Sequence, residues 1–178
     1  SERFRASGGR TVPGERRVWV TDTFHQAMGV ARKIQALAAV AHAQEREFSL
    51  VTCLEEPSAP AGIEHRNFPP VGHFDFPNRD GIRMAFPPFL DVIEYFEDQQ
   101  FSEIIVSTPG PLGLTAIAAA RLLGIPVAGI YHTDFPQYVK YLTDDPMLEQ
   151  LTWRYMLWFY NQMDRIYVPS KSYVRRLT

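Results

Sequence analysis

The chain has 178 residues, of which 46% are hydrophobic, so it is long and apolar enough for one globular domain with a substantial core. Its formal net charge of −2 gives no general electrostatic field for nucleic acid or for an anionic membrane. The single cysteine, Cys53, excludes a disulfide within the chain and a zinc cluster built from thiols. Its place in the apolar run FSLVTCL predicts a buried packing residue.

Residues 1–15 combine several arginines with Ser, Gly and Pro and have no apolar periodicity. We interpret this segment as a disordered leader or linker rather than as a basic binding site. The sequence contains no apolar stretch of about 20 residues, the length that spans a bilayer, and its polar start lacks the apolar core of a secretion signal. A cytoplasmic protein is therefore expected.

The folded part, residues 16–178, alternates short apolar runs with segments of helical periodicity. Strands are predicted, in chain order, at 17–22, 48–54, 63–68, 103–109, 126–132 and 165–170. Helices are predicted at 29–43, 87–100, 112–124 and 146–163, with shorter ones at 135–142 and from Lys171 onward. Residues 69–82 contain five Pro or Gly breakers and are predicted to be irregular.

Two of the predicted helices have informative apolar patterns. In 29–43 the residues Val30, Ile34, Leu37 and Ala41 fall on one face, which predicts an amphipathic helix. The helix at 146–163 carries apolar residues around much of its surface, including four aromatic side chains that either pack in the core or face a membrane. No lysine-rich face accompanies them, which favours the core. The four are Trp153, Trp158, Phe159 and Tyr160.

Strands that are almost continuously apolar and alternate with helices are typical of a parallel sheet covered on both faces. The fold class predicted is therefore α/β, with a Rossmann-like, doubly wound and mostly parallel sheet of about six strands. In such a sheet, ligands bind beyond the carboxyl ends of the strands. The residues to examine are those at the strand exits, which are 21–23, 107–110, 132–134 and 169–170.

Each of these exits allows a functional and a structural interpretation. Gly29, near the start of the first helix, suits either a phosphate contact or a tight turn. His132 is either a proton carrier or hydrogen-bond donor to a ligand, or a residue that only closes its strand. Asp134 either contacts a ligand or caps the helix that begins at Phe135. The run STPGPLGL, 107–114, is a stiff turn, the rigid rim of a cleft, or both.

Several enzyme classes lack their motifs in this sequence. There is no G-x-S-x-G elbow for a serine hydrolase and no Walker lysine for a P-loop nucleotidase. The histidines and Cys53 do not show the spacing of a metal site.

Four segments together resemble a known family: DTF after the first strand, GV at the first helix, STPGPLGLTAIAAARLLGIPVAGIYHTDFPQY, and the closing VPS. Residues 17–178 resemble the N-terminal domain of family 4 glycosyltransferases, and most of all the branch of lipid-directed mannosyl- and sulfoquinovosyltransferases. Such enzymes have the two-domain GT-B fold, of which this chain would be one half. They move a sugar from a nucleotide-sugar donor to an acceptor with retention of the anomeric configuration, and they generally need no metal or other cofactor.

The resemblance also implies roles for particular residues. Gly29 matches the loop glycine that approaches the donor diphosphate, and His132 matches the strand-end histidine beside the transferred sugar. Asp134 and Phe135 match the family motif as acceptor-binding or loop-shaping residues, and the same two roles are expected for Thr108 and Gly110 in the STPGP segment.

The family's partners follow in the same way. We expect a nucleotide-sugar donor, a glycosyl acceptor and the chain's own C-terminal domain, which carries the nucleotide pocket and a pair of glutamates. That domain is absent from this sequence, which ends inside a predicted helix, so a truncated hexosyltransferase that is inactive in isolation is expected. No nucleic acid partner is expected, whereas contact with the inner face of a membrane is left open. Two other interpretations remain: a non-catalytic Rossmann-like binding module, and half of another GT-B enzyme such as a nucleotide-sugar epimerase.

Overall fold

The computed structural model describes residues 16–22, 47–56, 62–75, 83–131 and 145–168, together with residues 36, 39, 40 and 43. Its main sheet has six strands in the order β3-β2-β1-β6-β7-β8, and every neighbouring pair is parallel. The strands are β1 (Arg17–Val20), β2 (Phe48–Thr52), β3 (Glu64–Asn67), β6 (Glu103–Val106), β7 (Val127–Ile130) and β8 (Arg165–Tyr167). This sheet confirms the predicted α/β fold class, and each predicted strand of the sheet is present, shortened by two or three residues.

The order of the strands determines where ligands bind. Counted in chain order within this sheet, the strands run 3-2-1-4-5-6, which is the Rossmann arrangement. The chain turns back at β1, whose neighbours are β2 on one side and β6 on the other. The crevice of such a sheet opens at this switch point, outside the carboxyl ends of β1 and β6.

Three helices are described: α2 (Phe89–Gln99), α3 (Pro111–Leu123) and α5 (Pro146–Tyr160). Proline occupies the first position of α3 and of α5, where its missing N–H costs no helical hydrogen bond. As predicted, Gly124 ends α3, and it does so with a left-handed φ of 69° that glycine adopts without strain.

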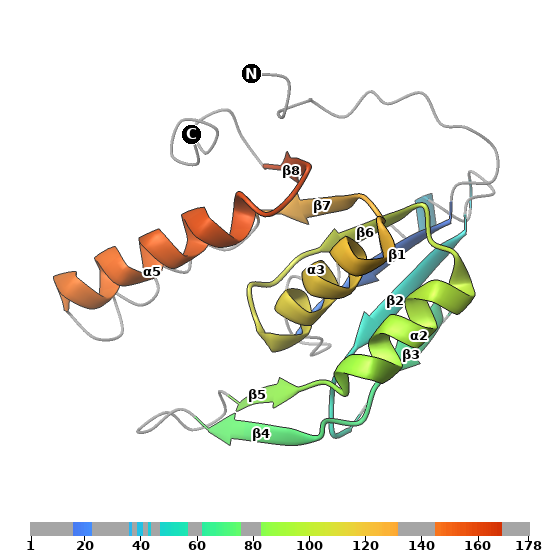
Figure 1. Cartoon of the computed structure of the whole chain (residues 1–178), viewed down its shortest axis with the longest axis horizontal. Coiled ribbons are helices and arrows are strands. Elements are labelled where there is room, and N and C mark those ends of the chain that lie inside the picture. The colour runs from blue at the N-terminus through green and yellow to red at the C-terminus, as the bar shows by residue number, and fades with distance from the viewer. Residues whose placement is uncertain are drawn as a thin grey trace.

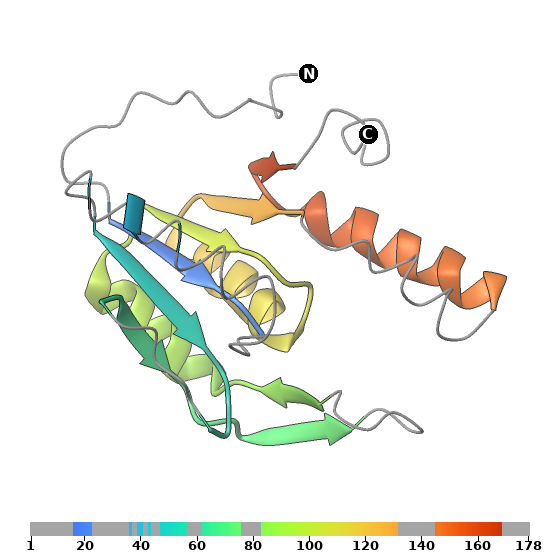
Figure 2. The same ribbon diagram turned by 180° about the vertical axis from the view of Figure 1, so that it is seen from behind.

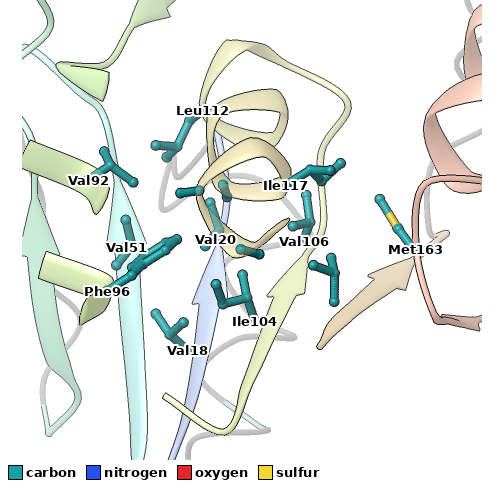
Figure 3. Close-up of a cluster of buried hydrophobic side chains, with 14 of the residues drawn as sticks. Val18, Val20, Val51, Val92, Phe96, Ile104, Val106, Leu112, Ile117 and Met163 are labelled. Atoms are coloured by element: carbon teal, nitrogen blue, oxygen red, sulfur yellow. The ribbon is translucent and has the colours of Figure 1, made fainter. Parts of the chain in front are cut away.

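Helices α2 and α3 cover one face of the sheet (Figures 1 and 2). Figure 3 shows the core beneath them, where Val18 and Val20 of β1 lie beside Ile104 and Val106 of β6. Side chains alternate along β1, so Trp19 faces the opposite side of the sheet. There it joins a second apolar cluster with Leu50, Ile105 and Ala128. Of the predicted helix at 29–43, the four described residues are helical and exposed, and the apolar positions named above lie outside the described residues.

Polar side chains fix the carboxyl ends of the edge strand β3 and of its neighbour β2. The Thr52 hydroxyl lies 2.8 Å from His65 Nε2 and donates to Asn67 Oδ1 at 2.8 Å. Asn67 also pairs with both the N–H and the carbonyl of Leu54, at 2.9 Å each. Burial lowers the pKa of His65, so this histidine is a neutral structural residue at pH 7.

The prediction of irregular structure over 69–82 was wrong in part. Residues Gly72–Asp75 form β4, which pairs antiparallel with β5 (Arg83–Phe86) in a separate two-stranded sheet. The breakers Pro69 and Pro70 precede β4, and the strand begins only at Gly72. Strands of four residues beside so many breakers give too weak a periodic signal to be recognised in the sequence. The hairpin extends beyond the main sheet on the side to which the strands point (Figures 1 and 2).

The prediction that the aromatic residues of the 146–163 helix lie in the core was correct for two of the four. Phe159 and Tyr160 are buried, but Trp158 is 52% exposed and Trp153 is only half-buried. The buried residues Met156, Phe159 and Tyr160 have the i, i+3, i+4 spacing of one helix face, and Trp158 lies off that face. The N-terminal part of α5 also runs out past the other described elements (Figures 1 and 2). The exposed apolar residues Met147, Leu148 and Leu151 lie in that part.

No helix among the described residues is both long enough and apolar enough to cross a membrane.

Candidate functional site

Asp22 is the centre of the polar structure at the switch point. It lies two residues after the end of β1, and its carboxylate accepts hydrogen bonds from the Thr108 hydroxyl at 2.7 Å, from the Leu112 N–H at 2.7 Å and from the Gly113 N–H at 3.2 Å. Its own N–H donates to the oxygen of the same Thr108 hydroxyl at 2.7 Å. The side chain therefore joins the exit of β1 to the exit of β6 and to the first turn of α3.

Asp22 acts as the N-terminal cap of α3, although it comes from another strand. The residue at the cap position itself is Gly110, which has no side chain to accept a hydrogen bond, and Pro111 has no N–H to donate. The Asp22 carboxylate satisfies the free N–H groups that follow, and the positive end of the helix dipole favours its negative charge. The N-terminus of α3 is thus already occupied by an anion that belongs to the chain.

The two glycines of this turn are required by close packing. A Cβ atom on Gly110 would lie 2.4 Å from Cγ of Asp22, so a larger residue would push the carboxylate out of its place. A Cβ atom on Gly113 would lie 2.2 Å from the backbone oxygen of Thr108. The two glycines of PGPLG therefore lie where the β6–α3 turn packs against Asp22 and against its own backbone.

The electrostatics of the site follow from its burial. Desolvation raises the pKa of Asp22, although the Thr108 hydroxyl and the N–H groups of Leu112, Gly113 and Gly110 all favour the carboxylate and oppose this shift. For an acid whose pKa is raised by folding, the stability it contributes is fully present below the unfolded pKa of about 3.8 and is lost as pH rises through the folded pKa.

Two neighbouring groups are held in their neutral forms. Burial, with a smaller effect from Asp22, raises the pKa of the Cys53 thiol to about 12, and the same two causes raise the pKa of Tyr155 to about 12. Cys53 is buried, as predicted, and at neutral pH its thiol is neither a nucleophile nor a metal ligand.

Helix α5 is fastened to two strand exits by tyrosine hydroxyls. Tyr155 donates to the carbonyl of Pro109 at 2.5 Å, and Tyr160 donates to the carbonyl of Ile130 at 3.1 Å. Tyr131, the residue after β7, is buried, and its ring packs edge-to-face on the ring of Tyr160 with 5.4 Å between the ring centroids. Its backbone N–H donates to the carbonyl of Tyr167 at 2.8 Å. The end of β7 is therefore rigid up to the residue that precedes His132 in the sequence.

The structure describes two of the predicted site residues. Thr108 and Gly110 both contact Asp22, and Thr108 is only 5% exposed. A contact of either residue with an acceptor remains a prediction. The other four lie outside the described residues; they are Gly29, His132, Asp134 and Phe135.

Sequence reasoning named Asp22 as part of a strand exit but did not predict its pairing with the first turn of α3. A signal for it is present in the sequence, because a helix that begins at Gly-Pro lacks a capping side chain of its own. The hydroxyl of Tyr155 was not identified at all. Among the described residues, no group of three or more His, Cys, Asp or Glu side chains has the geometry to hold a metal ion.

The sheet order and its polar carboxyl edge define this chain as a Rossmann-type α/β domain with a ligand-binding edge at β1, β6 and β7. Comparison with known proteins identifies the family, because the sequence profile of Glycosyltransferase Family 4 matches residues 27–178. The chain is also 30% identical over 154 residues to the alpha-monoglucosyldiacylglycerol synthase of Streptococcus pneumoniae. That alignment covers 85% of the chain and 34% of the relative, so the chain spans about a third of the length of the curated relative it matches. The chain belongs to Glycosyltransferase Family 4, and its resemblance to that family is thereby confirmed.

Proposed function

We propose that residues 16–178 form the acceptor-side half of a glycosyltransferase that transfers a hexosyl group from a nucleotide-sugar donor with retention of the anomeric configuration. The observation that carries this proposal is the family match, which extends over residues 27–178 and includes the exits of β6 and β7. The proposal includes no metal ion and no other cofactor. Retention is tested by proton NMR of the product, in which the anomeric coupling constant shows whether donor and product share one configuration.

The proposed roles agree with the order of the strands. Because β1, β6 and β7 are adjacent and parallel, the segments that follow them in the sequence leave from one edge of the sheet. We assign Gly29 to the donor diphosphate and His132 to the transferred sugar. Asp134 and Phe135 are assigned to acceptor contact or to loop shaping. Thr108 and Gly110 carry the same two alternatives, and their contacts with Asp22 favour loop shaping.

The donor site is proposed to belong mostly to a second domain. Isolated residues 1–178 are therefore expected to produce no detectable glycoside, because they would lack most of the hydrogen-bonding groups that stabilise negative charge on the leaving diphosphate. The measurement incubates the purified chain with UDP- and GDP-linked glucose and mannose and with diacylglycerol, and analyses the products by mass spectrometry. The full-length protein under the same conditions is the positive control. Turnover by the isolated chain at the rate of the full-length protein would show that it holds the whole donor site.

We further propose that the acceptor is a lipid and that the enzyme works on a membrane surface at the cytoplasmic side. The relative's name specifies a monoglucosyldiacylglycerol, which is a glycolipid. Two projections flank the carboxyl edge of the sheet (Figures 1 and 2). Both carry exposed large apolar side chains. One consists of the β4–β5 hairpin and the start of α2, and the other is α5. Their exposed apolar residues are Val71, Phe74, Phe86, Phe89, Leu90, Met147, Leu148, Leu151 and Trp158.

Vesicle binding tests these projections. Replacing Leu90 or Leu151 by serine is expected to weaken binding to phosphatidylcholine vesicles that contain diacylglycerol by roughly fivefold each, because partial burial of a leucine contributes about 1 kcal/mol. Leu122→Ser is the matched control. This leucine is 69% exposed, compared with 75% for Leu90 and 60% for Leu151, but it lies near the end of α3, at the opposite edge of the sheet. Equal effects of all three changes in a flotation assay would assign the binding to general hydrophobicity rather than to the projections.

A further inference from the structure

We infer that Asp22 is a positioning residue for sugar transfer, which fixes the start of the β1 exit loop and keeps the donor diphosphate away from the N-terminus of α3. The inference rests on the proposed function, because it assigns Asp22 a part in donor binding. Because the Asp22 carboxylate is already engaged by Thr108, Leu112 and Gly113, we expect it to act through the loop and not by touching substrate.

The exit of β1 is rigid through Thr21 and Asp22. Thr21, the residue after β1, is fully buried and its N–H donates to the carbonyl of Val51 at 3.1 Å, so the chain is still held beside β2 one residue beyond the strand. The next residue, Asp22, is held on both sides by Thr108, through its own N–H and through its carboxylate. The last described residue after β1, Asp22, is therefore held in a fixed position relative to Thr108.

The hydrogen bonds of the Asp22 carboxylate serve two elements at once. An ordinary cap at position 110 would satisfy the α3 N–H groups and leave the β1 exit loop unattached. Here Gly110 supplies no cap, and a Cβ atom there would collide with the carboxylate. The hydrogen bonds that cap α3 are consequently the same ones that anchor the loop. A change in Asp22 disturbs both together.

The negative charge of Asp22 disfavours a phosphate group at the N-terminus of α3. Helix N-termini attract phosphate groups, and the start of α3 lies at the ligand edge of the sheet. The Asp22 carboxylate occupies the Leu112 and Gly113 N–H groups that a phosphate would use. A second anion at this helix would meet both a filled site and a like charge at close range. We infer that the diphosphate is thereby directed away from α3 and toward Gly29, the residue assigned to it above.

The test uses the full-length protein and the donor and acceptor pair that it turns over best. Asp22→Asn keeps the shape of the side chain, but it replaces one accepting oxygen by an NH₂ group. We expect the donor kcat/KM to fall by about tenfold to a hundredfold, mainly through a higher donor KM, because the loop that meets the diphosphate is no longer held in place. Kinetics are measured well below the melting temperature of each variant, so that loss of folded protein does not enter the result.

Asp164→Asn is the matched control. The Asp164 carboxylate also accepts a backbone hydrogen bond, from the Val127 N–H at 2.9 Å, but it does so at the amino end of β7, away from the ligand edge. We expect this variant to lower the melting temperature and to leave the donor KM unchanged. If Asp22→Asn does not fold, Thr108→Val provides the test, because it removes only the hydroxyl that joins the two exits. Where both variants fold, their combined effect on kcat/KM should be smaller than the product of the single effects, because they break one shared contact.

The outcomes separate this inference from the proposed function. A full-length protein that transfers no sugar from any nucleotide donor would overturn the proposed function, and the role of Asp22 in donor binding with it. An active protein in which Asp22→Asn lowers the melting temperature but leaves kcat and KM as in the wild type would overturn the inference alone. In that case Asp22 would be a structural cap and nothing more.

Discussion

Replacing Gly113 by alanine is expected to lower the free energy of unfolding by at least about 2 kcal/mol, and this is the largest stability effect we expect from a single methyl group. The added Cβ would lie 2.2 Å from the Thr108 carbonyl oxygen and 3.1 Å from Val106 Cγ1. The carbonyl belongs to the backbone and cannot rotate away. Alanine in a helix gains about 1 kcal/mol over glycine, which offsets only part of this collision.

Thermal unfolding of the 178-residue chain measures the effect, since about 1 kcal/mol shifts the melting temperature of a domain of this size by roughly 2–4 °C. Gly72→Ala is the control, because a Cβ atom there would have no heavy atom within 4 Å. Gly124→Ala has equally open space but a φ of 69°, so it isolates backbone strain of about 1 to 2 kcal/mol from steric collision. A Gly113→Ala protein as stable as the Gly72→Ala protein would mean that the β6–α3 turn is looser than the packing indicates.

The order of strands and helices was predictable because most strands of the main sheet are short, apolar and bounded by polar or breaker residues, although β3 is polar throughout. β6 and β7 have the clearest signals, with EIIV buried throughout and VAGI followed by the buried Tyr131. Local rules also predicted the end of α3 at Gly124, whereas Pro111, which begins the helix, lay one residue outside the predicted range. These features depend on nearest neighbours in the sequence, and they require no knowledge of tertiary structure.

The features that were missed depend on distant parts of the chain. Asp22 and Leu112 are 90 residues apart in sequence, and only the adjacency of β1 and β6 brings them together. The exposure of Trp158 likewise depends on which face of α5 packs against the rest of the chain, and the aromatic residues around much of the helix do not reveal this. Hydrophobic periodicity shows which face of an element is apolar, but it does not show whether another element covers that face.

Part of the candidate site was predictable from local sequence patterns, and part depends on contacts between distant parts of the chain. Its location at the exits of β1, β6 and β7 followed from the α/β pattern and the general rule for such sheets. Its internal organisation, with Asp22 capping α3 and Tyr155 holding Pro109, emerged from tertiary contacts. These contacts make one half of the edge rigid and closed to a second anion. We therefore expect substrate contacts to come from the loops that follow Asp22 and Tyr131.

His132→Ala in the full-length protein is expected to reduce turnover by roughly a hundredfold to a thousandfold, because loss of a donor that stabilises transition-state charge typically costs about 2 to 4 kcal/mol. We expect this effect because His132 directly follows Tyr131, whose ring and backbone N–H are both held in place at the ligand edge. A histidine that only closed its strand with a hydrogen bond would instead contribute about 1 kcal/mol to folding and nothing to turnover.

His65→Ala is the matched control for this experiment, because the His65 ring contacts the Thr52 hydroxyl at 2.8 Å on an edge strand. Its loss should lower the melting temperature and leave turnover unchanged, whereas His132→Ala should do the reverse. Turnover and melting temperature are therefore measured for both variants and for the wild type. A His132→Ala protein with near-normal turnover and a lowered melting temperature would show that His132 is structural. The chemical step would then have to be assigned to other groups at this edge.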